Sequence, residues 1–275
     1  MAKLKGDSLA VLEYFTSGAF SNSDAVGRTN YYSITSVPRA KFNGRRQVIG
    51  GSDATFNQYH NAYLLELGFP SACLLDIFVD YDSTTRNLKV KSRVTAVDTF
   101  ENARIRYAIA ESHIQYKWGG PPPSPELDSV HHVVRKMLPN YVGVSIPAMN
   151  PNDTFIDSQT YTLPIPATDT SCCDDTNCYV VVFVQDDDDP THPVFRSAKS
   201  GLFLTWVYGD ANGDSTVNVA DIVYLVTYLF LDGPAPDPRA SGDANYDCVL
   251  DIGDAVYLVT YVFMEGPEPQ KGCAW

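Results

Sequence analysis

An internal repeat near the C-terminus limits what this chain can fold into more than any other feature. The segment 209–221, GDANGDSTVNVAD, returns 33 residues later as the segment 242–254, GDANYDCVLDIGD. Each copy runs into an apolar stretch, residues 222–230 and 255–263, which is followed closely by a Gly-Pro pair. Because glycine and proline commonly follow the last turn of a helix, the repeat predicts two copies of a loop that leads into a helix.

Both loops carry oxygen ligands at the spacing that wraps a calcium ion. In such loops side chains bind at positions 1, 3, 5, 9 and 12, and the backbone carbonyl binds at position 7. The expected ligands of the first loop are Asp210, Asn212, Asp214, the Thr216 carbonyl, Asn218 and Asp221. Those of the second loop are Asp243, Asn245, Asp247, the Val249 carbonyl, Asp251 and Asp254. The sequence therefore predicts two bound Ca²⁺ ions.

A purely structural alternative exists, because Asp and Asn also cap helices and make turns. Two loops in register, each followed by the same helix, favour the calcium interpretation. One position departs from the calcium-loop pattern. Ser215 and Cys248 stand at position 6, where glycine usually makes the sharp turn, and this departure bears on the affinity for the ion.

The repeat resembles the dockerin module, because Asp221 and Asp254 replace glutamate at position 12 and no helix precedes the first loop. The resemblance covers residues 208–275. It implies a module that folds around two calcium ions and plugs a secreted protein into a cohesin-type receptor, often on a cell surface. Cys248 and Cys273 flank the second helix, and we expect a disulfide between them to hold the end of the module.

The two predicted helices carry tyrosines at equivalent positions. These are Tyr224, Tyr228, Tyr257 and Tyr261. Stripes at this spacing belong either to an exposed docking face or, more commonly, to a core.

Charge and composition exclude several partners. The net charge of −13 argues against a nucleic-acid binder, since such proteins carry basic patches. The negative charge is concentrated near the C-terminus, because residues 208–275 hold eleven acidic side chains and only two basic ones, Arg239 and Lys271. No apolar run has the length of a membrane-spanning helix. Six cysteines without a C-x-x-C pair favour disulfides in an oxidising compartment, and hence an extracellular or cell-surface location.

Residues 1–70 are expected to form a truncated α/β segment. The pattern predicts a buried strand at 9–16, a hairpin turning at Asn43-Gly44 and a helix at 56–67. With Val37-Pro38 at the place of a cis-proline, this order resembles a thioredoxin-like domain. Its redox chemistry is not expected here, since residues 17–22 contain no cysteine.

Residues 71–207 predict an antiparallel β-sandwich. Apolar side chains alternate in the stretches 77–81, 88–94 and 105–109, and the run 179–184 suggests a central strand. The stretches 105–111, 131–139 and 182–186 resemble a family of bacterial outer-membrane-associated proteins in which a thioredoxin-like domain precedes a sandwich. That family implies no activity for this chain.

The first 207 residues contain further histidines, carboxylates and cysteines that could form a site, but their spacing favours structural roles. Adjacent side chains on a strand, such as His131 and His132, point to opposite faces and are poorly placed to share a metal. The carboxylates of residues 186–189 lack ligand spacing and suit a solvated loop. The cluster Cys172, Cys173 and Cys178 suggests a local disulfide, with Cys73 bonded to the remaining cysteine. Hydrolase, phosphate-loop and dinucleotide-binding motifs are absent from the sequence.

Taken as a whole, the sequence predicts a multidomain, mainly β protein. Its parts are a truncated thioredoxin-like α/β segment (1–70), an antiparallel β-sandwich (71–207) and a small helical dockerin-like calcium-binding module (208–275). We expect a secreted, non-catalytic assembly protein that docks onto its own neighbour, head to tail into a filament, or onto a cohesin-like receptor. The alternative is a dockerin-bearing accessory protein or enzyme whose sandwich acts on polysaccharide. A thiol oxidoreductase is disfavoured by the missing thiol pair.

Overall fold

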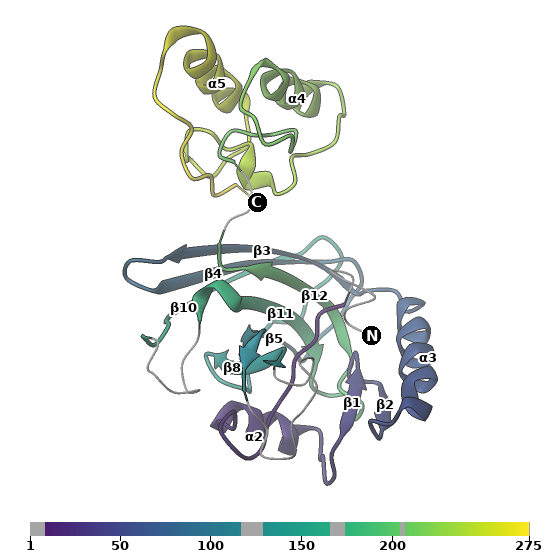
Figure 1. The fold of residues 1–275 in the computed structure, drawn as a ribbon. Helices are drawn as coiled ribbons and strands as arrows, with labels where there is room; N and C mark the ends of the chain where they lie inside the picture. The colour runs from purple at the N-terminus through teal and green to yellow at the C-terminus, as the bar shows by residue number, and fades with distance from the viewer. Residues whose placement is uncertain (1–8, 117–128, 166–173, 204–206, 275) are drawn as a thin grey trace. The chain divides into compact units, whose positions relative to one another are not determined.

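The computed structural model describes residues 9–116, 129–165, 174–203 and 207–274 of the chain. The chain divides into two compact units, Met1–Phe203 and Leu204–Trp275, each with its own apolar core (Figure 1). The first unit is built mainly from antiparallel strands and the second around two helices. The predicted mainly β, multi-part architecture is therefore confirmed.

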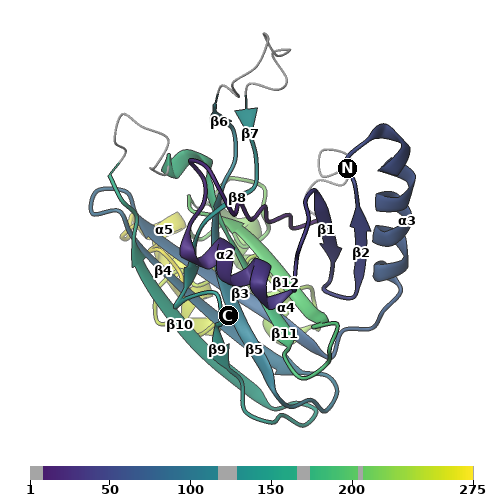
Figure 2. The ribbon, with the colours of Figure 1, turned by 90° about the horizontal axis from the view of Figure 1, so that it is seen from below.

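Two antiparallel sheets form the sandwich of the first unit (Figure 2). The smaller has the order β10 (Thr154–Thr162), β4 (Asn87–Ala96), β3 (Cys73–Asp82). The larger has the order β12 (Val194–Gly201), β11 (Cys178–Asp186), β5 (Ala103–Glu111), β8 (Val133–Leu138), and β9 (Val144–Ser145) also pairs with β5. A short pair, β6 (Ile114–Gln115) and β7 (Ser129–Val130), stands apart.

Alternating side chains of the two sheets make the sandwich core. Val90 and Val94 of β4 belong to the same apolar cluster as Ile105 of β5 and Val182 of β11, and all four are fully buried. Successive side chains on a strand point to opposite faces, so the predicted alternation is what brings these residues onto the inner face.

The central strand β11 is buried on both faces, which explains why its sequence is a continuous apolar run. Val181 and Phe183 point away from the sandwich core into a second cluster. Leu12 and Tyr14 of the N-terminal segment pack against that cluster. The N-terminal residues therefore share a core with the larger sheet.

Two predicted elements of the N-terminal segment are confirmed. Helix α3 (Phe56–Leu67) has the predicted bounds, and β1 (Arg39–Phe42) pairs with β2 (Arg46–Ile49) through the Asn-Gly turn. Asn43 and Gly44 both adopt positive φ, which this turn requires. A side chain at Gly44 would overlap the backbone carbonyl of His192, so the turn also needs glycine for its close approach to the sandwich.

The strand predicted at residues 9–16 is wrong. The segment makes only an isolated bridge, between Glu13 and Val133. It crosses over the larger sheet and covers the second cluster with its side chains, so most of its backbone does not join a ladder. Its apolar residues are accounted for by this covering role.

Helix α2 (Ser23–Tyr31), which the sequence analysis missed, is tied to β8 by buried polar contacts. Asn22 caps the helix by accepting from the Ala25 amide at 2.9 Å. Asp24 is 3% exposed and accepts from the Lys136 ammonium at 2.8 Å and the Met137 amide at 3.0 Å. Its second oxygen accepts from the Tyr141 amide at 3.0 Å.

The C-terminal unit packs helix α4 (Val219–Phe230) against helix α5 (Ile252–Met264) around Leu225 and Leu258, which are fully buried. A short 3₁₀ turn, η5 (Arg239–Ser241), lies between them in sequence. Both predicted helices are present and begin three residues earlier than the apolar runs. In the part of the chain that the structure describes, no helix has the length and apolar character needed to cross a membrane.

We expect Asp24→Ala to lower the free energy of unfolding of the first unit by about 3 kcal/mol, because it leaves the Met137 and Tyr141 amides and the half-buried Lys136 ammonium without their acceptor. Urea unfolding followed by circular dichroism measures the change. Asp53→Ala removes an exposed carboxylate from the same segment and is expected to cost less than about 0.5 kcal/mol. Equal losses in both variants would show that Asp24 does not anchor α2.

Candidate functional site

The first and last acidic residues of each loop lie inside the C-terminal unit. Asp210 is 3% exposed, and Asp221, Asp243 and Asp254 are completely buried. These four residues are named the inner carboxylates below. The repeat places one pair in each loop, at positions 1 and 12.

In the first loop the inner carboxylates are held by backbone amides. Asp210 accepts from the amides of Gly213 at 2.9 Å and Ser215 at 2.8 Å. Asp221 accepts from the Asn212 amide at 3.1 Å and the Asn218 amide at 2.9 Å. The loop backbone therefore wraps around both carboxylates and fixes their orientation.

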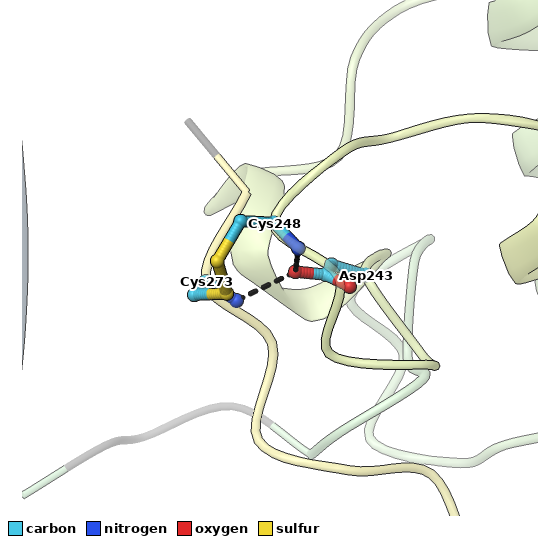
Figure 3. Close-up of side chains that lie close together, drawn as sticks. All are labelled: Asp243, Cys248 and Cys273. Atoms are coloured by element: carbon cyan, nitrogen blue, oxygen red, sulfur yellow. Dashed lines mark hydrogen bonds between the residues drawn. A yellow bond between two sulfur atoms is a disulfide. The ribbon is translucent and has the colours of Figure 1, made fainter.

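In the second loop one carboxylate oxygen is left over (Figure 3). Asp243 Oδ2 accepts from the amides of Cys248 at 3.2 Å, Cys273 at 2.7 Å and Ala274 at 2.9 Å. Asp243 Oδ1 is buried and, among the described residues, has no hydrogen-bond partner. Buried acceptors almost always have a donor or an ion, so this oxygen points to a missing partner.

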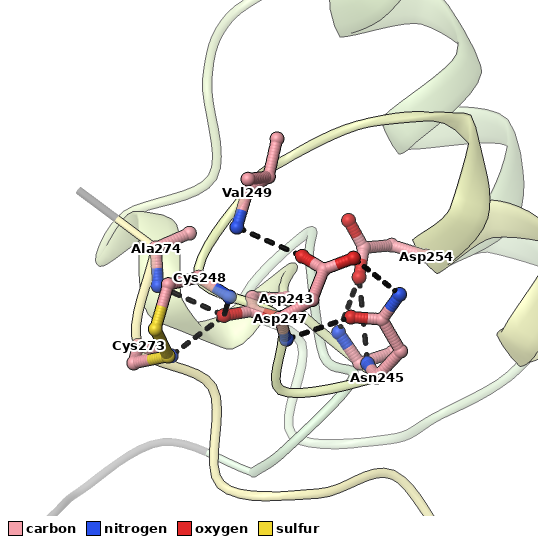
Figure 4. The surroundings of a disulfide bond; sticks show 9 residues. Asp243, Asn245, Asp247, Cys248, Val249, Asp254, Cys273 and Ala274 are labelled. Carbon is pink, nitrogen blue, oxygen red and sulfur yellow. Dashed lines mark hydrogen bonds between the residues drawn. A yellow bond between two sulfur atoms is a disulfide. The ribbon is translucent and has the colours of Figure 1, made fainter.

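Asp254 faces the same loop (Figure 4). It accepts from the Ala244 amide at 2.9 Å and the Asp251 amide at 3.0 Å. Burial raises the pKa of Asp254 to about 6, and the charge of Asp243 adds to this shift. Burial likewise raises the pKa of Asp221 in the first loop.

No lysine or arginine within the described ranges forms an ion pair with the inner carboxylates. Removing an anion from water without a counter-charge costs several kcal/mol, even when amides donate to it. The C-terminal unit therefore holds concentrated negative charge that no ion pair of the described residues balances.

The remaining predicted ligands lie at the loop surfaces, and their side chains bond mainly within the loops. They are Asn212, Asp214, Thr216, Asn218, Asn245, Asp247, Val249 and Asp251. Asn218 and Asp251 cap their helices by accepting from the Ala220 and Gly253 amides. With Asp221 and Asp254 they form two capping boxes, so the helix-capping alternative describes part of these loops.

Position 6 is left-handed in both loops. The φ angle is +67° at Ser215 and +66° at Cys248. This conformation costs a non-glycine residue roughly 1–2 kcal/mol. It turns the Ser215 and Cys248 amides toward the Asp210 and Asp243 carboxylates, so the turn that glycine usually makes is formed here without it.

The predicted bridge between Cys248 and Cys273 is confirmed, with 4.6 Å between the Cα atoms. Asp243, Cys248 and Cys273 come close enough to suggest a metal cluster, but the two sulfurs are bonded to each other. The bridge instead holds the tail against Asp243, where the Cys273 and Ala274 amides donate (Figure 4).

The expectation that Cys73 forms a disulfide is wrong. Its thiol is free and completely buried in the sandwich core, and burial raises its pKa to about 11. Cys178 is also buried, at the start of β11. Cys172 and Cys173 lie outside the described residues, so the predicted local bridge stays a prediction.

The other polar candidates have structural partners. The His132 Nδ1 lies 2.9 Å from the Tyr179 hydroxyl, and burial lowers the pKa of His132 to about 4. Asp187, from the acidic run predicted as a solvated loop, accepts two hydrogen bonds from the fully buried Arg106 at 2.7 and 3.0 Å. No local pattern in the sequence predicts this pair, because its partners lie 81 residues apart.

The tyrosines of the two helices are half-buried, and two of them bond to the loops that follow. The Tyr224 hydroxyl donates to the Ala235 carbonyl, and the Tyr257 hydroxyl donates to the Glu268 carbonyl. The apolar side chains that stand out into solvent are different residues, in matched pairs between the repeats. They include Val219 and Ile252, Val223 and Val256, and Phe230 and Phe263.

Each set of three follows an i, i+4, i+11 spacing and therefore lies on one face of its helix. These two faces are named the helix stripes below. The sequence could have revealed them, because all six residues obey the repeat.

No protein-family model matches this chain, and no curated protein matches it. Among solved structures, it is similar to HBP35 of Porphyromonas gingivalis, with a TM-score of 0.46 and 11% identity over 64% of this chain. It spans 56% of the length of that protein. A domain of the outer membrane lipoprotein Omp28 from Porphyromonas gingivalis aligns with a TM-score of 0.31 and 12% identity, covering 48% of this chain and 88% of that domain. Both likenesses are partial.

We expect the double variant Cys248→Ser/Cys273→Ser to destabilise the C-terminal unit by about 3 kcal/mol, because the bridge closes a loop across 25 residues of sequence. Thermal unfolding followed by the helical circular dichroism signal measures the loss. A reducing agent should destabilise the unit in the parent protein and leave the double variant unchanged. An unaltered unfolding temperature in the double variant would contradict the anchoring role of the bridge.

Proposed function

We propose that this chain is a secreted, non-catalytic assembly protein whose C-terminal unit binds two Ca²⁺ ions and docks onto a partner protein. The observation that carries the proposal is the fully buried Asp243 Oδ1, which has no partner among the described residues. The other inner carboxylates support it, because they too are buried without a counter-charge.

Calcium fits the donor set better than other ions. The loops offer carboxylate, amide and carbonyl oxygens, and the only sulfurs nearby are joined in a disulfide. Hard oxygen ligands in an adaptable loop suit Ca²⁺, whereas zinc and copper prefer nitrogen and sulfur. Asp210 and Asp221 would hold one ion, and Asp243 and Asp254 the other, with the remaining ligands at the loop surfaces.

The helix stripes support a docking role. Phe230 is 64% exposed and its counterpart Phe263 is 63% exposed, which is unusual for side chains of this size in a unit with its own core. The partner is either the neighbouring copy of this chain or a separate cohesin-like receptor. In the first case the contact is head to tail and builds a filament if the rotation does not close.

The disulfide supports an extracellular or bacterial cell-surface location, since such bridges persist in oxidising compartments. Residues 9–70, which resemble a truncated thioredoxin-like domain, serve in this proposal as a scaffold that shares its core with the sandwich. The polysaccharide alternative is less favoured. Within the described part of the sandwich sheets, no strand carries an exposed aromatic side chain on which a sugar ring would stack.

We expect calorimetric titration to show two Ca²⁺ ions per chain, and Asp243→Asn to reduce this to one. The substitution removes a buried charge while nearly keeping the side-chain shape. Asp210→Asn should remove the other ion. Glu268→Ala deletes an exposed acidic side chain outside the loops and should leave the stoichiometry at two. Absence of calcium binding by the parent protein at millimolar concentration would sink the proposal.

We expect light scattering and electron microscopy to show large ordered assemblies in calcium that dissolve with excess chelator, if the docking partner is the neighbouring copy. Val223→Glu/Val256→Glu should prevent this assembly while two ions still bind, because it charges both helix stripes outside the loops. A calcium-loaded protein that stays monomeric would contradict docking onto its own copy and make a separate receptor the partner.

A further inference from the structure

The sandwich has one sheet edge that lacks the usual protection against pairing. Strand β10 pairs with β4 on one side, and no strand of the described chain pairs with its other side (Figure 2). Its register against β4 runs through nine residues without a bulge. A free edge of this length presents a row of backbone amides and carbonyls that can accept another strand.

The other edges of the two sheets carry charged side chains or register shifts that oppose pairing with another strand. Strand β3 carries Asp76, Asp80 and Asp82 and lies against β12. Strand β12 carries Arg196 and Lys199, and its register shifts beside Val184. Strand β8 carries Arg135 and Lys136, with a register shift as well. Charges and bulges of this kind block edge pairing, and β10 has no Lys, Arg, Pro or bulge.

The single charge on β10 does not guard its edge. Asp157 is half-buried and accepts from the Tyr107 hydroxyl of the facing sheet at 2.8 Å. It also accepts from the Gln159 amide of its own strand at 2.8 Å. The carboxylate is therefore held on the inner face of the sheet and leaves the edge open.

The sequence of β10, TFIDSQTYT, is complementary to itself about its central residue, Ser158. Antiparallel pairing of two copies about a two-fold axis would align Thr154 with Thr162, Phe155 with Tyr161, Ile156 with Thr160, Asp157 with Gln159, and Ser158 with Ser158. Aromatic side chains then meet aromatic, β-branched meet β-branched, and a carboxylate meets an amide donor. Each such cross-strand pair is stabilising, and no like charges lie directly opposite.

We propose that β10 pairs with β10 of a second copy of this chain, antiparallel about Ser158, and joins the two three-stranded sheets into one. The contact is isologous, because the same residues serve on both sides. It uses no residue of the C-terminal unit, so it forms without calcium. It is therefore independent of the docking proposed above.

Sedimentation equilibrium in excess chelator tests this pairing separately from calcium-dependent docking. The parent protein should show a mass of twice 30.3 kDa that dissociates on dilution. Ser158→Lys places two ammonium groups face to face on the axis and should give the monomer mass. Ser197→Lys adds the same charge at an exposed position on β12 and should leave the dimer intact.

Cysteine cross-linking tests the register and does not depend on the lysine variant. Ser158→Cys should form a covalent dimer under mild oxidation, because position 158 faces itself. Ile156→Cys and Thr160→Cys should cross-link when the two variants are mixed, and much less when each is alone. Monomers at every concentration in chelator, a dimer that Ser158→Lys leaves unchanged, or cross-links that ignore this register would overturn the proposal.

Discussion

Charge removed from water has to be balanced, and both units of this protein are organised by that constraint. In the first unit the balance is internal: Asp24 meets Lys136, and Arg106 meets Asp187. Both pairs join residues that are distant in sequence, and the first, between helix α2 and strand β8, also helps to hold the N-terminal residues on the sandwich. In the second unit the inner carboxylates have backbone amides for partners and, within the described residues, no lysine or arginine paired with them.

The two units therefore treat buried charge differently, and the proposed ion binding rests on that difference. A buried ion pair leaves nothing for a ligand, whereas a buried anion that meets only amides keeps an unbalanced field. The disulfide reinforces the arrangement, because it holds two tail amides against one oxygen of Asp243, while no described residue donates to the other. In both loops the left-handed residue at position 6 also turns its amide toward the carboxylate at position 1, at a cost in backbone strain.

The two proposed contacts of this chain differ in symmetry and in control. The pairing of β10 with itself is isologous and closes on two copies. Docking through the helix stripes onto a neighbouring copy would be heterologous, and it would continue from chain to chain. A protein with one contact of each kind forms paired strands of subunits. In such an assembly calcium would govern the growth of each strand, while the pairing across strands would persist in its absence.

The sequence by itself determined the features that depend on near neighbours. The 33-residue repeat predicted both helices, strand alternation predicted the sandwich, and Asn43-Gly44 predicted a hairpin. Each rests on the fixed periodicity of a helix or strand, or on a turn within a few residues. The sequence also misled in places: residues 9–16 have the composition of a buried strand, and Cys73 belonged to an even set of cysteines.

Only the tertiary structure decided which sheet residues 9–16 cover, which partner Asp187 meets, and which oxygen of Asp243 is left over. It also placed β10 at the edge of its sheet, and only an edge strand can use a self-complementary sequence to pair with a second copy. These outcomes depend on contacts between residues many positions apart. Such contacts are set by how whole elements pack, and no local spacing in the chain encodes them.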